Sequence, residues 1–163
     1  MASGDERAEF GDLDGSGLRV GVIATRWNND IVSRLIEGAE RGLESVGVAS
    51  VEHKSVPGAY ELPLAAMALA KSGAVDAIVV LGAVIRGETT HYELVAGECG
   101  RGIMDVQLTT GIPIGLGILT VENHEQAIAR SEASGGHNVG EEAALAAVEV
   151  ALLTTRLDSD QTS

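Results

Sequence analysis

The chain has 163 residues, enough for one domain with a buried core, and its formal net charge of −13 disfavours nucleic acid as a partner. Hydrophobic residues make up 45% of the chain and aromatic residues only 2%, so the core must consist mainly of Val, Ile, Leu and Ala. The single cysteine, Cys99, excludes an internal disulfide and fits a reducing compartment.

Strand-like and helix-like patterns alternate along the chain. The polar, acidic stretches at 1–17 and 158–163 are expected to be flexible tails, which leaves one domain at 18–157. Strands are predicted at 18–24, 48–55, 76–81 and 112–119, and helices at 29–46, 60–71, 91–109, 122–131 and 140–157. Strands separated by helices predict a three-layer α/β/α domain with a four-stranded parallel sheet.

The last predicted helix is apolar on nearly all sides. Such a helix is buried on more than one face, and subunit contact is the simplest cover in a chain of this length, so we expect a homo-oligomer. The start of the chain lacks a signal-like pattern, and no apolar run reaches membrane-spanning length. We therefore expect a cytoplasmic protein without membrane contact.

Ligands of open α/β sheets bind beyond the carboxyl ends of the strands. The richest segment there is 86–93, where Thr90 and Glu93 form a predicted capping box that starts a helix near His91. Its free N–H groups form a predicted anion site, the Thr89 hydroxyl can add a donor, and His91 is a candidate general base. The alternative is a capped helix with a solvated histidine.

Three further positions at this edge are candidates, each with a plainer alternative. Between two prolines, the turn at 57–63 exposes rigid backbone suited to a pyrimidine ring, and Glu61 can accept bonds from sugar hydroxyls; otherwise it is a structural turn. Trp27, the only tryptophan, can stack on a heterocycle or plug the sheet edge. Arg130 can bind a phosphate or answer the dipole of its own helix, which Asn123 and Gln126 are expected to cap.

Several other kinds of site are excluded because the sequence lacks their motifs. The histidines have no metal-ligand spacing with Cys or carboxylates, and dinucleotide, P-loop and nucleophile-elbow motifs do not occur. Cys99 lies on the apolar stripe of a predicted helix and is expected to be a core residue.

Taken together, these segments resemble the lumazine synthase family over residues 20–151. The resemblance rests on Val-Pro-Gly-Ala-Tyr-Glu-Leu-Pro at 56–63, Leu-Gly-Ala-Val-Ile-Arg-Gly-Glu-Thr-Thr-His-Tyr-Glu at 81–93, Gly-Ile-Met-Asp-Val-Gln-Leu at 102–108, Gly-Ile-Leu-Thr-Val-Glu-Asn at 117–123 and Glu-Gln-Ala-Ile-Ala-Arg at 125–130. It implies a flavodoxin-like subunit that forms homopentamers or icosahedral 60-mers, with active sites between subunits. Riboflavin synthase is an implied protein partner.

The implied reaction joins 5-amino-6-(D-ribitylamino)uracil to 3,4-dihydroxy-2-butanone 4-phosphate and yields 6,7-dimethyl-8-ribityllumazine, phosphate and water, without metal or cofactor. By resemblance, His91 transfers protons and Arg130, from a neighbouring subunit, binds the phosphate. The other implied substrate-binding residues are Trp27, Gly58, Ala59, Tyr60, Glu61, Ala83, Val84, Ile85 and the neighbour's Leu116 for the pyrimidine and ribityl chain, and Gly87, Glu88 and Thr89 for the phosphate.

One turn departs from the family pattern. The family often has a lysine in a Gly-Asn-Lys-Gly turn before the last helix, where this chain has Val139, and His137 is a partial substitute for the missing cation. Val139 would fit one alternative, a non-catalytic shell or binding protein for a lumazine or flavin, whereas the retained His91, Glu61 and Arg130 argue against it. A second alternative is an FMN electron carrier, against which the scarcity of aromatic residues argues.

Overall fold

The computed structural model describes residues 9–162 and contains four strands, five α-helices and one 3₁₀ turn. The elements are β1 (Arg19–Thr25), α1 (Asn29–Ser45), β2 (Ser50–Val56), η1 (Ala59–Glu61), α2 (Leu62–Lys71), β3 (Ala77–Ile85), α3 (His91–Thr110), β4 (Ile114–Val121), α4 (His124–Ala129) and α5 (Val139–Thr162). All four strands are parallel, in the order β2-β1-β3-β4.

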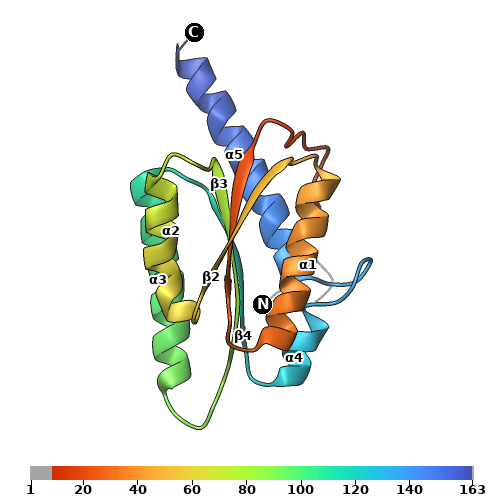
Figure 1. Cartoon of the computed structure of the whole chain (residues 1–163), viewed down its shortest axis with the longest axis vertical. Coiled ribbons are helices and arrows are strands. Elements are labelled where there is room, and N and C mark those ends of the chain that lie inside the picture. The colour runs from red at the N-terminus through yellow and green to blue at the C-terminus, as the bar shows by residue number, and fades with distance from the viewer. Residues whose placement is uncertain (1–8, 163) are drawn as a thin grey trace.

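Helices cover both faces of the sheet (Figure 1). On one face α2 and α3 pack over a core that includes Ile23, Leu62 and Ile103. On the other face α1 and α5 pack over a second core, which includes Val22, Leu35 and Ala147, with α4 beside them. The predicted three-layer α/β/α domain with a four-stranded parallel sheet is therefore confirmed.

The hydrophobic patterns explain the places of the elements in this fold. The sequence Ala-Ile-Val-Val-Leu of β3 is fully buried, because this central strand meets helices on both faces. The outer strand β2 is mostly exposed. Helix α5 lies very close to β4: a Cβ on Gly115 would be 2.0 Å from the carbonyl oxygen of Ala143. Small residues on both elements therefore let the two backbones approach.

The boundaries differ from prediction at several points. Strands β3 and β4 continue to Ile85 and Val121, because these residues still pair with one another. The helix predicted at 122–131 is shorter, at His124–Ala129. The last helix was expected to end at residue 157 but continues to Thr162.

The predicted amino-terminal tail at 1–17 is covered only in part, since residues 1–8 lie outside those described. Leu13 packs against the core, and the amide of Gly15 donates a 2.7 Å hydrogen bond to the carbonyl of Val46. The ordered contacts of the chain thus begin before the expected domain start at residue 18. Across residues 9–162, no helix is both long and apolar enough to cross a membrane.

Candidate active site

A pocket of about 570 Å³ opens at the carboxyl ends of β1, β2 and β3 and is closed on one side by the start of α3. Nine of the predicted site residues line it: Trp27, Gly58, Ala59, Tyr60, Glu61, Ala83, Val84, Ile85 and His91. They come from four separate segments, which the parallel arrangement of the strands brings to one edge of the sheet. Asn28, Leu94 and Val95 complete the lining.

Asn28, like Leu94 and Val95, is a pocket residue that the sequence-based site prediction missed. Its backbone is left-handed, with φ of 57°, and its side-chain amide donates a 3.0 Å hydrogen bond to the carbonyl oxygen of Ala83. It therefore ties the start of α1 to the end of β3. The available signal was the Asn-Asn pair at 28–29, which follows the first strand after two intervening residues, since asparagine tolerates this backbone conformation better than most residues.

Trp27 and Glu61 approach each other across Gly58. A Cβ on Gly58 would lie 3.0 Å from Cδ1 of Trp27 and 3.3 Å from Oε2 of Glu61, so a larger residue there would have to shift one or both side chains by a few tenths of an ångström. Trp27 is 72% exposed within a single chain, which argues against the alternative of a hydrophobic plug at the sheet edge. The indole and the carboxylate thus stand together at the pocket mouth, a flat apolar surface beside a hydrogen-bond acceptor.

Helix α3 begins at His91, as predicted, but its start is built differently from the expected capping box. Within residues 9–162, the Thr90 side chain forms no capping hydrogen bond. The Glu93 carboxylate instead pairs with the guanidinium of Arg86, and this bond holds the pKa of Glu93 below its usual value. The capping-box prediction was therefore wrong, because a cation seven residues earlier takes the carboxylate that would have closed the box.

The predicted phosphate-binding residues Gly87, Glu88 and Thr89 form the exposed connection from β3 to α3. They precede His91 by two to four residues, although they lie outside the lining of the pocket. The hydroxyl of Thr89 accepts a 3.4 Å hydrogen bond from the amide of His91, instead of acting only as a free donor.

Leu116 and Arg130 are not brought to this pocket within one chain. Leu116 lies on the outer strand β4 and is 52% exposed. Arg130 ends α4, on the sheet face opposite α3, and its guanidinium donates to the carbonyl of Gln126 at 2.9 Å. The expected cap of α4 is confirmed, since Asn123 accepts a bond from the amide of Gln126.

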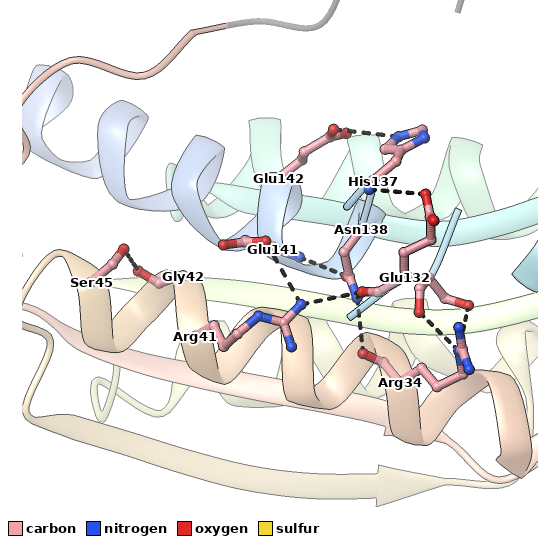
Figure 2. A network of polar contacts seen from close by, with 10 residues as sticks. Arg34, Arg41, Gly42, Ser45, Glu132, His137, Asn138, Glu141 and Glu142 are labelled. Carbon is pink, nitrogen blue, oxygen red and sulfur yellow. Dashed lines mark hydrogen bonds and ion pairs between the residues drawn. The ribbon is translucent and has the colours of Figure 1, made fainter. Parts of the chain in front are cut away.

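The turn that departs from the family pattern is held by Asn138 (Figure 2). The Asn138 side chain donates to the carbonyls of Arg34 and Glu132, at 3.1 Å and 3.0 Å, and accepts from the amide of Glu141 at 3.1 Å. Val139 is half-buried and packs against the core. The side chain of His137 lies 3.4 Å from the Glu142 carboxylate, so its imidazole already faces an acid.

Two observations bear on metal binding and on thiol chemistry. In the part of the chain that the structure describes, no three His, Cys, Asp or Glu residues are grouped as a metal site would require. Cys99 is buried in α3, as expected of a core residue, and burial raises the pKa of its thiol to about 11. A thiolate nucleophile at neutral pH is therefore not available from this residue.

Comparison with known proteins gives one consistent result. Residues 17–155 match the model of the 6,7-dimethyl-8-ribityllumazine synthase family. Curated proteins of that name include one from Kineococcus radiotolerans, 49% identical over 90% of this chain and 91% of the relative, and one from Azoarcus sp., 46% identical over 94% and 97%. A third, from Deinococcus radiodurans, is 45% identical over 86% of this chain and 92% of its own length.

Proposed function

The chain belongs to the 6,7-dimethyl-8-ribityllumazine synthase family, and from this premise we propose that the pocket at the carboxyl edge of the sheet is its active site. The chain is accordingly a transferase of riboflavin biosynthesis. It condenses 5-amino-6-(D-ribitylamino)uracil with 3,4-dihydroxy-2-butanone 4-phosphate and releases phosphate and water. This assignment decides against the FMN electron carrier.

The observation that carries the site proposal is the convergence of Trp27, Glu61 and His91 on one pocket from three distant segments. The exposed indole of Trp27 stacks on the pyrimidine ring, and Glu61 accepts hydrogen bonds from the ribityl hydroxyls. The backbone of 58–60 and 83–85 supplies rigid donors and acceptors for the ring edges.

The phosphate binds beside this ring, at the start of α3. Gly87, Glu88 and Thr89 offer backbone amides there, and α3 directs the positive end of its dipole toward them. Three features thus meet: an apolar ring site, a polar ribityl site and an amide-rich phosphate site. Together they fit the two substrates side by side.

In the proposed mechanism, the amine of the pyrimidine attacks the ketone carbon and forms an imine with loss of water. Phosphate then leaves, and the second amino group closes the ring with loss of another water. His91 carries protons between these steps, because an imidazole can act as both acid and base near neutral pH. Alignment of the two substrates supplies much of the remaining rate.

Leu116 and Arg130 enter the proposal as contributions of an adjacent copy. Both lie away from the pocket of their own chain, and Val150, Leu153 and Leu157 form exposed apolar positions along α5. We propose a homopentamer whose neighbouring subunits complete each site, with a 60-subunit shell as its larger assembly. Light scattering on the purified protein distinguishes a monomer, a pentamer and a shell.

We place the enzyme in the cytoplasm, with riboflavin synthase as the partner that consumes its product. The decisive test mixes the purified protein with both substrates and follows lumazine fluorescence. Product formation is expected, whereas stable binding of a lumazine without turnover would favour the non-catalytic binding protein.

The role of His91 is tested by His91→Ala, which is expected to lower turnover about ten- to a hundredfold while assembly stays intact. Unchanged turnover would remove His91 from the mechanism. Arg130→Ala is expected to raise the KM for the sugar phosphate, and a change in the pyrimidine KM alone would contradict its phosphate role.

A further inference from the structure

Arg86 joins three segments that meet beside the pocket. Its backbone amide donates a 2.8 Å hydrogen bond to the carbonyl of Val121, which extends the pairing of β3 with β4 by one residue. Its guanidinium lies 2.8 Å from the Glu122 carboxylate, pairs with Glu93 in the first turn of α3, and stacks 4.2 Å from the ring centre of Tyr92. One side chain therefore connects the end of β3, the end of β4 and the start of α3.

The segment that follows Arg86 has few other anchors. Residues 86–90 are all exposed, and a Cβ on Gly87 would meet nothing within 4 Å. The hydrogen bond from the His91 amide to the Thr89 hydroxyl is 3.4 Å long, and the expected cap by Thr90 is not formed. The position of this connection thus depends largely on the contacts of Arg86.

Arg86 also sets the charge around the connection. Glu93 and Glu122 lie on either side of it, in a chain whose net charge is already −13. Without the guanidinium, two carboxylates would face a bound phosphate with no cation between them. Because both carboxylates already engage the guanidinium, Arg86 is occupied within the chain and is not free to serve as the phosphate ligand itself.

We propose that Arg86 is a positioning residue for the sugar phosphate: it clamps the start of α3 to the end of β4, so that the amides of 87–89 and the His91 imidazole face the same substrate. This inference rests on the proposed function of the pocket. It predicts that disturbing Arg86 affects the sugar phosphate more than the pyrimidine, because Trp27 and Glu61 are held by other elements.

The test compares Arg86→Met and Arg86→Lys with a matched control, Arg19→Met. Arg19 is also an arginine paired with a carboxylate, Asp76 at 3.0 Å, but at the opposite end of the sheet. For Arg86→Met we expect a KM for the sugar phosphate raised about tenfold, with the pyrimidine KM within about twofold, since small misplacements of aligned groups cost up to about a hundredfold. Arg86→Lys keeps the charge but not the fork, so its KM should be intermediate.

A second readout uses inorganic phosphate, a product of the reaction, as a competitive inhibitor against the sugar phosphate. Phosphate should inhibit Arg86→Met more weakly, so that its inhibition constant rises in parallel with the KM. The inhibition constant should stay unchanged in Arg19→Met. If the wild-type protein makes no lumazine, the proposed function fails whatever the variants do.

If the wild type is active, the clamp is overturned by an unchanged sugar-phosphate KM in Arg86→Met, by an equal rise in the pyrimidine KM, or by an equal effect of Arg19→Met. Should Arg86→Met not fold, Glu122→Gln removes one arm of the clamp and is expected to shift the same KM by a smaller factor. An unchanged sugar-phosphate KM in that variant would likewise overturn the proposal.

Discussion

Asn138 is the residue whose loss should most clearly loosen the turn before α5. Its buried side chain, 2% exposed, donates to two backbone carbonyls and accepts from one amide (Figure 2). It sits directly on Gly38 of α1, where a Cβ would lie 2.0 Å from the amide oxygen. Asn138→Ala therefore breaks three hydrogen bonds at a point where α1, the turn and α5 meet.

The expected cost follows from these bonds. Each contributes about 1 kcal/mol net, so Asn138→Ala should lower the free energy of unfolding by about 3 kcal/mol. For a chain of this size that corresponds to a thermal midpoint about 6–12 °C lower. Asn123→Ala is the matched control, because it removes a single capping bond and should cost about 1 kcal/mol, or about 2–4 °C.

The assay is thermal unfolding followed by far-UV circular dichroism at one protein concentration. The two variants should differ clearly, with Asn138→Ala the less stable. Equal midpoints for both variants would refute the reasoning, since three buried bonds would then count no more than one exposed cap.

Three further outcomes are expected. Gly58→Ala should raise the pyrimidine KM several-fold by displacing the indole, whereas Gly17→Ala, with open space around it, should not; the ratio of the two KM values measures this. Cys99, whose thiol has a pKa of about 11, should resist alkylation at pH 8 until the protein is unfolded, as mass spectrometry can show. A hydrogen bond from Arg19 lowers the pKa of Asp76 below 3.8, so its stabilising effect is complete above that pH and lost as the pH falls through the folded pKa. In urea unfolding at pH 7, Asp76→Asn should therefore have a lower free energy of unfolding than the wild type. The difference in free energy between the two proteins should shrink below about pH 3.8.

Much of the fold could be predicted because the hydrophobic periods are clean. The continuous apolar run of β3 marks a strand that is covered on both faces, and the helical spacing of Ile31, Leu35 and Leu43 marks the buried face of α1. Strand ends were harder to place, because pairing such as that of Ile85 with Val121 depends on a neighbour distant in the sequence.

The site was predictable to the extent that strand ends in a parallel sheet meet at one edge. The errors in the site prediction arose where a side chain pairs with a different partner from the one that its local sequence pattern indicates. Thr90 and Glu93 have the spacing of a capping box, yet Arg86 takes the carboxylate, and no local pattern reports that choice. Asn28 was missed because its role depends on a backbone carbonyl 55 residues away. The roles given to Leu116 and Arg130 stay predictions, since both need a second copy of the chain.

The course of α5 has a practical consequence. The helix runs away from the edge that carries the pocket, and the described chain ends at the far end of the molecule (Figure 1). A peptide tag or a fused passenger attached after the final residue would therefore emerge on the side remote from the substrate entrance. Immobilising the protein on a sensor surface through that extension should leave the entrance open to solution.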